Sequence, residues 1–298
     1  MNALHLPLFT LVFLLAAPLA CGGSTDEGTG GRGSGTKGGT GGTGVGTGGS
    51  GGIGTGGTGG TGGTGTTPPI IVTDASPSDV TSVDGGLCGT TLVGTVRDLQ
   101  DSHADFEKFT NISDKQIVAP MLAADQKPAY AGNPRTPSTT GKDNFDAWYH
   151  DVAGVNMALP VSIPLTNTGQ GTYSFNNDAF FPIDGQGFGN QGRNHNFHFT
   201  VEIHTRFIYR GGEVFTFKGD DDIFVFINGR LVINLGGVHE QQTEQVNLDA
   251  RAAELGIAKD GTYPLDLFFA ERHTVESHIR IDTTIGSFVD CGKPPPPK

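Results

Sequence analysis

The amino-acid sequence predicts an all-β fold, an antiparallel β-sandwich or squat barrel of many short strands with one short helix. Two observations predict it: apolar residues alternate with polar ones along several stretches, and turn signals separate these stretches from one another. Segments with a helical pattern are too few for a β/α barrel or a doubly wound sheet. The chain is therefore expected to fold almost entirely as strands.

The clearest strand covers residues 197–209, where every second residue is large and apolar or is threonine. Polar residues alternate with them, which indicates one buried face and one polar face. The dipeptide Asn228-Gly229 is a strong hairpin signal, and it joins predicted strands at 223–227 and 231–235. Further strands are expected at residues 91–96, 173–175, 214–217, 263–269 and 279–284. Leu248 to Leu255 is the one credible helix, with Asn247 as its N-terminal cap.

Glycine is unevenly distributed along the 298 residues. Of the 48 glycines, 25 fall among the 46 residues 22–67, together with 12 threonines. Because such a segment has almost no apolar side chains, it cannot bury enough surface to offset the entropy of ordering its backbone. We therefore expect a disordered linker at 21–67, a leading segment at 68–87, the β-domain at 88–291 and a proline-rich tail at 292–298.

The first twenty residues predict export. Leu6 to Leu19 form an apolar run that is too short to span a bilayer, and residues 1–20 have the pattern of a signal peptide. Cys21 follows Pro18-Leu19-Ala20 and resembles the acylated cysteine of bacterial lipoproteins, although leucine is expected where Pro18 stands. The expected location is the outer membrane or cell surface of a bacterium, or the extracellular space. Ordinary cleavage near Ala20, leaving a free thiol, is the alternative.

The two other cysteines lie near the ends of the predicted domain. Because an even pair in an exported protein is most simply a disulfide, Cys88 and Cys291 are expected to be bonded to each other. Two unpaired buried thiols are the alternative. Such a bond would bring the ends of the domain close together.

The charge balance bears on partners. The chain has a net charge of −12, and the charges of the leader and linker cancel, so the whole excess belongs to residues 68–298. An acidic domain repels phosphate backbones, which argues against a nucleic-acid partner. Its charge is compatible with binding cations, and an acyl group on Cys21 would be its only membrane contact.

Three consecutive aspartates, Asp220-Asp221-Asp222, stand directly before the predicted strand 223–227. Neighbouring side chains of a strand point to opposite faces, so adjacent carboxylates share one ligand only where the backbone turns or the peptide is cis. A hard cation that takes six to eight oxygen ligands would favour such a geometry. A solvated acidic turn before a hairpin is the alternative.

The segment from Lys218 to His239, KGDDDIFVFINGRLVINLGGVH, resembles the central motif of the fibro-slime domain. That family belongs to the protective-antigen-type (PA14) β-domains, whose motif has paired aspartates, an apolar strand, a DG or NG turn and a second strand. Further matches are VRDLQDSHADFE from Val96, FFPIDGQGFGN from Phe180, HNFHFTVEIHTRFIYRGGE from His195 and FFAERHTVESHIRIDT from Phe268. The resemblance covers about residues 92–285.

The resemblance implies a β-sandwich of secreted or surface proteins. In carbohydrate-binding relatives such as yeast flocculins, two aspartates joined by a cis peptide hold a calcium ion that also takes sugar hydroxyls. Carried over to this chain, Asp220 and Asp221 become the calcium ligands. Candidates for further ligands, by oxygen chemistry only, are Asp222, Asn234, Asn247 and Glu271. Many domains of the wider group keep the aspartates for loop geometry alone.

The function expected from these observations is binding rather than catalysis. We expect a surface-displayed module that recognises a glycan or an extracellular polysaccharide with the help of calcium. A structural surface or matrix module without a ligand is the alternative. A metal-dependent hydrolase built on the nine histidines is a third hypothesis. None of these histidines has the spacing of a known catalytic motif such as H-E-x-x-H.

Overall fold

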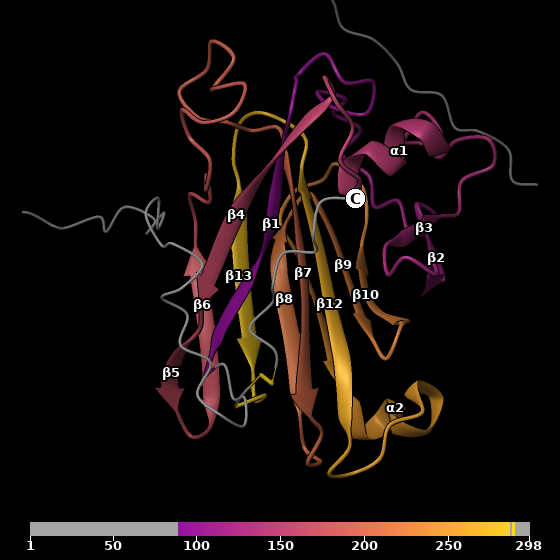
Figure 1. The fold of residues 1–298 in the computed structure, drawn as a ribbon, viewed down its shortest axis with the longest axis vertical. Coiled ribbons are helices and arrows are strands. Elements are labelled where there is room, and N and C mark those ends of the chain that lie inside the picture. Colours follow the sequence, from indigo (N-terminus) through magenta and orange to yellow (C-terminus); the bar gives the residue numbers. More distant parts are fainter. Residues whose placement is uncertain (1–88, 287, 290–298) are drawn as a thin grey trace, which may run out of the picture. The chain divides into compact units, whose positions relative to one another are not determined.

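Two antiparallel sheets make up the part of the chain that the computed structural model describes, residues 89–286, 288 and 289 (Figure 1). The larger sheet has eight strands in the order β3-β2-β10-β9-β12-β7-β1-β4, and the smaller has five in the order β11-β8-β13-β6-β5. A buried apolar cluster contains side chains from both sheets, so they pack face to face. The predicted all-β class is confirmed.

The elements have the following bounds. The strands are β1 (Thr91–Leu99), β2 (Val118–Leu122), β3 (Pro128–Tyr130), β4 (Asn156–Pro164), β5 (Thr166–Gly169), β6 (Thr172–Asn177), β7 (Phe199–Ile208), β8 (Val214–Asp220), β9 (Asp222–Ile227), β10 (Arg230–Leu235), β11 (Gln242–Asn247), β12 (Thr262–Glu271) and β13 (His278–Thr283). The helices are α1 (Lys142–Tyr149) and α2 (Leu248–Leu255).

Several predictions fall outside the described residues. They are the signal peptide, the acylation of Cys21, the linker, the Cys88–Cys291 bond and the proline-rich tail. Within the described ranges, neither helix has the length and the apolar character needed to cross a membrane.

The larger sheet is covered on both faces, which the alternation of β7 alone does not reveal. Val201 and Ile203 of β7 face the smaller sheet and join the cluster between the sheets. The opposite face carries the predicted polar residues, yet Thr200 and Glu202 on it are at most 1% exposed. A second apolar cluster covers this face, and it includes Phe145 and Trp148 of α1. The polar face of β7 is therefore buried at Thr200 and Glu202 and reaches solvent at Arg206.

The predicted hairpin and the predicted helix are both confirmed. Asn228 and Gly229 have φ angles of 50° and 73°, as tight two-residue hairpin turns require, and they join β9 to β10. The side chain of Asn247 accepts a hydrogen bond from the backbone N–H of Ala250 at the start of α2, at 3.2 Å. Gly256 ends this helix in the left-handed conformation.

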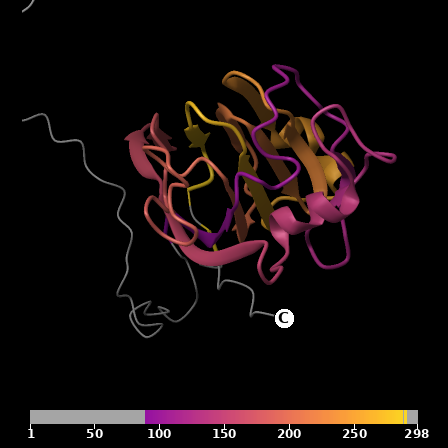
Figure 2. The same cartoon turned by 90° about the horizontal axis from the view of Figure 1, so that it is seen from above.

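The prediction of a single helix was wrong, because α1 also forms. Its residues Phe145, Trp148 and Tyr149 have helical spacing and lie buried on one face. The preceding residue is Gly141, which provides no side-chain cap, so the usual start signal is missing. Figures 1 and 2 show this helix and its neighbouring loops outside the two sheets.

Candidate functional site

The three aspartates lie where the chain passes from one sheet to the other. Asp220 ends β8 in the smaller sheet and Asp222 begins β9 in the larger one, so Asp221 is the single residue between them. The peptide between Asp220 and Asp221 is cis. Asp220 is paired with His278 of β13, and Asp222 with Ala270 of β12. The ends of four strands therefore meet at this crossing.

Asp222 forms an ion pair with Arg272. Its Oδ2 is 2.5 Å from Nε of Arg272 and its Oδ1 is 3.1 Å from Nη2, while the backbone N–H of Gly237 donates to Oδ1 at 2.6 Å. Both side chains of the pair are fully buried. The structure thus gives Asp222 a structural role, in contrast to the expectation that it adds to a ligand set.

Arg272 connects three further segments to this point. Its Nη1 donates to the backbone carbonyls of Asp105 and Ser138, both at 2.9 Å. Its guanidinium carbon lies 4.6 Å from the ring centroid of Trp148, as in a cation–π contact. Because all three guanidinium nitrogens donate hydrogen bonds, Arg272 fixes the loops at 105 and 138 to the aspartate crossing.

The side chains of Asp220 and Asp221 are almost completely buried. Their hydrogen-bond partners are backbone N–H groups and the ring of His278. The backbone N–H of His278 donates to Asp220 Oδ1 at 2.8 Å, and His278 Nδ1 lies 2.7 Å from Oδ2. Asp221 accepts backbone N–H groups of Arg272, at 3.0 Å, and of His239, at 3.3 Å. Burial raises the pKa of Asp220, and burial also raises the pKa of Asp221 well above its ordinary value, against the opposing charge of Arg272.

Glu271 adds a third carboxyl to the pair. It is 1% exposed, its Oε1 accepts one backbone N–H at 3.4 Å, and its Oε2 has no hydrogen-bond partner among the described residues. Burial raises its pKa well above the ordinary value, and the negative charges of Asp221 and Asp220 raise it further. The buried hydroxyl of Ser277 opposes this shift through its interaction with Glu271 and lowers the pKa. Asp220, Asp221 and Glu271, the carboxylate cluster, thus hold more negative charge than their partners neutralise.

The carboxylate cluster offers hard oxygen donors, and within the described part of the chain its side-chain ion-pair partner is His278, which contacts Asp220. Buried charges are costly unless they are paired or bound to a metal. A second set of donors lies at its edge, because oxygens of Asp220 and Glu276 and a ring nitrogen of His278 lie within 4.8 Å of one another. The arrangement can hold a divalent cation, and its oxygen-rich side suits a hard ion such as calcium.

Of the four further candidate calcium ligands, the structure brings only Glu271 and Asp222 to the crossing from β8 to β9. The side chain of Asn234 donates to the carbonyl of Lys115 at 3.1 Å and accepts from Gly236 at 3.2 Å. Asn247 caps α2 and is paired with Val214, at the far end of β8 from Asp220. Six residues of strand separate Val214 from Asp220, about 20 Å. The structure does not place Asn247 with the carboxylate cluster.

Sequence reasoning missed two residues of this site. Neither Arg272 nor His278 was singled out as a partner of the aspartates, although both lie in a segment that matches the fibro-slime pattern. They are separated from the aspartates by 50 residues or more, and only the pairing of β12 with β9 and of β13 with β8 brings them close. No local signal in the sequence indicates this pairing.

Three other histidines have hydrogen-bonded rings. His195 is bonded to Asp184, His198 to Glu107, and His239 to the carbonyl of Leu235.

A charged network covers the outer face of the larger sheet at His204. Nδ1 and Nε2 of His204 lie 2.7 Å from Asp266 and from Glu202 respectively. Glu202 also contacts Arg97, at 2.5 Å, and Lys127. Burial disfavours the charged forms, but the hydrogen bonds and charges outweigh it, so the pKa of Glu202 falls to about 2 and that of His204 rises to about 9.

Replacing His204 by glutamine is expected to have a pH-dependent effect on stability. Because the pKa of His204 is higher in the folded state than its ordinary 6.5, its charged form stabilises the fold fully below pH 6.5, and this is lost as the pH rises through about 9. The shift corresponds to about 3 kcal/mol. Urea unfolding should therefore show the variant less stable by up to about 3 kcal/mol at pH 6 and close to wild type at pH 10. If the free energies of unfolding of the variant and the wild type differed equally at both pH values, the raised pKa of His204 would be contradicted.

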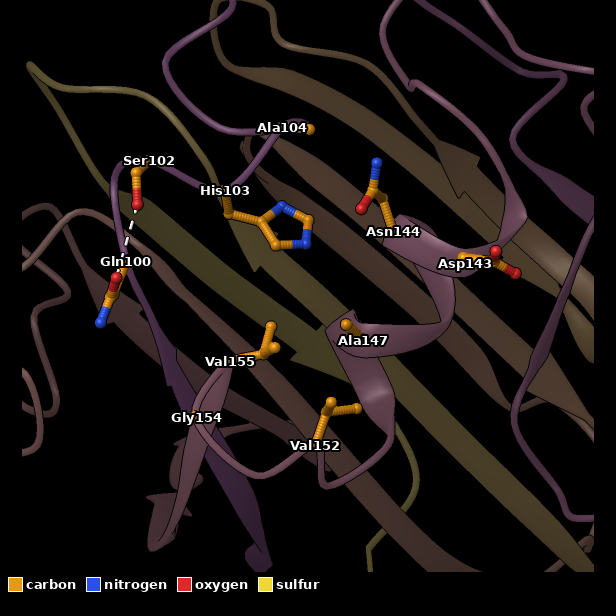
Figure 3. A pocket seen from close by; sticks show the side chains of 10 residues that line it. All are labelled: Gln100, Ser102, His103, Ala104, Asp143, Asn144, Ala147, Val152, Gly154 and Val155. Atoms are coloured by element: carbon orange, nitrogen blue, oxygen red, sulfur yellow. Dashed lines mark hydrogen bonds between the residues drawn. The ribbon is translucent and has the colours of Figure 1, made fainter.

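A separate hollow of about 430 Å³ lies beside α1 (Figure 3). It is lined by Gln100, Ser102, His103, Ala104, Asp143, Asn144, Ala147, Val152, Gly154 and Val155. The ring of His103 lies between the loop at 100–104 and the helix, and its Nε2 is buried without a hydrogen-bond partner. None of the residues of the carboxylate cluster lines it.

Comparison with known proteins identifies part of the chain. Residues 167–288 match the model of the PA14 domain, which confirms the resemblance to protective-antigen-type domains. Protein psiR of Dictyostelium discoideum is 40% identical over 209 residues, which cover 63% of this chain and 21% of psiR. The chain spans less than half the length of the curated relatives it matches.

Two solved structures are similar to this chain only at a low level. The PA14 sugar-binding domain of an RTX adhesin is 12% identical with a TM-score of 0.25, over 38% of this chain and 69% of that domain. The A domain of epithelial adhesin 9 of Candida glabrata, in complex with Galb1-3GlcNAc, is 14% identical with a TM-score of 0.26, over 70% and 85% of the two chains. These TM-scores are too low for the role of any residue in those structures to be assigned to a residue of this chain.

Proposed function

With a PA14 domain at residues 167–288 as the premise, we propose that this protein is a surface-displayed module for calcium-dependent recognition of carbohydrate. The ligand would be a glycan or an extracellular polysaccharide. The observation that carries the proposal is the carboxylate cluster, in which the negative charges of Asp221 and Asp220 act on the buried Glu271, whose Oε2 has no hydrogen-bond partner among the described residues. Export and an acyl anchor at Cys21 remain predictions from the sequence.

A hard cation fits this donor set better than a transition metal does. Calcium takes six to eight oxygen ligands from carboxylates, carbonyls and water. Asp220 and Asp221 supply carboxylate oxygens from the β8–β9 crossing, and Glu271 from the end of β12. An ion there would neutralise the charge that now raises the pKa of Glu271. When bound, calcium would supply open coordination positions for the hydroxyl groups of a sugar. The residues of the cluster would hold it.

One observation favours a second function, a structural module without a ligand. Asp220 and Asp221 accept backbone N–H groups from His278, Arg272 and His239, so they order three loops without an ion. A domain that needed the aspartates only for this purpose would keep the same crossing. The two functions differ in whether calcium binds.

Calorimetric titration of the purified full chain with calcium separates the two functions. We expect one calcium site in the wild type and at least 100-fold weaker binding in the double variant Asp220→Asn/Asp221→Asn, because each amide keeps the size of the carboxylate but loses its charge and one acceptor oxygen. The matched control is Asp282→Asn, which changes an aspartate on β13 that pairs with Arg280 away from the cluster. The control should bind calcium as the wild type does.

A glycan array, printed with neutral and acidic sugars, then tests recognition in the presence of calcium and of a chelator. Binding that requires calcium supports the module proposed here. A wild-type chain without a calcium-specific heat, or a double variant that binds calcium equally well, would favour the structural module instead.

A further inference from the structure

Three of the exposed large hydrophobic side chains lie on two loops beside the carboxylate cluster. Phe109 is 59% exposed, Ile112 is 40% exposed and Val275 is 77% exposed. Two other large hydrophobic residues among the described residues are also exposed, Met121 and Val152. Because single exposed hydrophobic residues are ordinary, the position of these three is informative only through what holds their loops in place.

Backbone hydrogen bonds hold the loop of Phe109 against the residues that carry Asp221. The N–H of Glu107 donates to the carbonyl of Arg272 at 2.8 Å, and the N–H of Asp114 donates to the carbonyl of Gly236 at 2.5 Å. Arg272 is itself a donor to Asp221. The loop is therefore attached on both sides of Phe109 to the segments that surround the carboxylate cluster.

The loop between β12 and β13 meets Phe109 directly. The ring of His273 lies 5.1 Å from the ring of Phe109, centroid to centroid, at an angle of 41°. The backbone N–H of the same histidine is directed at Oε1 of Glu271, at 3.4 Å. Thr274, the next residue, donates through its hydroxyl to Glu107 at 2.7 Å. An aromatic ring with most of its surface in solvent thus contacts His273, whose backbone N–H reaches Glu271 of the carboxylate cluster.

We infer that Phe109, supported by His273, is the stacking surface on which a neutral pyranose ring lies while its hydroxyls reach the cation site. This inference rests on the proposed function. A pyranose has an apolar face of C–H groups and a polar edge of hydroxyls, and an exposed aromatic ring beside an oxygen-lined site matches both.

The charge of the surroundings favours a neutral sugar over an acidic one. The chain carries a net charge of −12, and Glu276, whose side chain is 73% exposed, lies beside His278 at the edge of the cluster. An acidic polysaccharide would therefore meet repulsion outside the cation itself. A protein that docks on Phe109, Ile112 and Val275 is the competing occupant, and it needs no calcium.

The test compares Phe109→Ala and Phe109→Trp with Met121→Ala, a control at an exposed apolar residue. Met121 is 44% exposed and is paired with Arg230 next to the β9–β10 turn, at the other end of β9 from Asp222. Each full-length variant is titrated with calcium and is applied to a glycan array of neutral and acidic sugars at saturating calcium. Thermal unfolding confirms that each variant is folded.

We expect Phe109→Ala to bind the neutral glycans of the wild type at least ten-fold more weakly and to keep its calcium affinity within two-fold. Phe109→Trp and Met121→Ala should bind both as the wild type does. Glycan binding that survives in Phe109→Ala would overturn the stacking surface while leaving the proposed function intact. Binding confined to acidic glycans, or calcium-independent capture of a protein through Phe109 without any glycan binding, would also overturn it. A wild type that binds no calcium would instead count against the proposed function itself.

Discussion

Replacing Arg272 by alanine should lower the free energy of unfolding by about 3–5 kcal/mol, as is typical when one partner of a buried ion pair is removed. The variant leaves Asp222 fully buried with no opposite charge. It also leaves the backbone carbonyls of Asp105 and Ser138 without their donor and removes the cation from the face of Trp148. Urea unfolding, followed by circular dichroism, measures the loss.

Two further variants identify the cause of this loss. Arg280→Ala removes an arginine whose ion pair with Asp282 is largely exposed, and it should cost less than about 1 kcal/mol. The double variant Arg272→Leu/Asp222→Leu removes both charges and should recover part of the stability lost in Arg272→Ala. If Arg272→Ala were no more destabilising than Arg280→Ala, the central role given to Arg272 would be wrong.

Replacing Glu271 by glutamine should make the protein more stable than the wild type in chelator and less stable than the wild type in saturating calcium. In chelator, the wild-type carboxyl has a pKa raised above its ordinary 4.5, so the fold loses stability as the pH rises above that value. The neutral glutamine removes this cost and makes the variant the more stable protein at pH 7. In calcium, the wild type gains about 2.7 kcal/mol at 100 times the dissociation constant, and the variant gains less.

Thermal unfolding at pH 7 in chelator and in saturating calcium measures this reversal. Glu254→Gln is the control, because Glu254 on α2 is 57% exposed and pairs with Arg251. The control should unfold at the same temperature as the wild type in chelator and in calcium. Contrary evidence would be a Glu271→Gln variant that is less stable than the wild type in chelator, or one that gains as much from calcium as the wild type.

The features that the sequence predicted well are those that depend on neighbours along the chain. The alternation of β7, the turn at Asn228-Gly229 and the cap at Asn247 each depend on a few consecutive residues, and each is present in the structure. Helix α1 was missed because its start lacks a capping side chain. Strand β4 was missed because Pro160 and Pro164 interrupt its pattern, and such residues are tolerated there since β4 is at the edge of its sheet.

The candidate site could be predicted only in part, for the same reason. Asp220 and Asp221 are adjacent in the sequence, so their pairing could be proposed from the motif alone. The role of Asp222 could not, because its partner Arg272 lies 50 residues further on and comes close only through the register of β12 against β9. Glu271 was named by its oxygen chemistry, and the structure adds its burial and its unpartnered oxygen.

Locating the ion tests the central claim most directly. Crystals of the protein grown with calcium, measured for anomalous scattering, would show where calcium binds. The account predicts one strong peak at about 2.3–2.6 Å from carboxylate oxygens of Asp220, Asp221 and Glu271. A calcium peak elsewhere, or none at these carboxylates in saturating calcium, would contradict it.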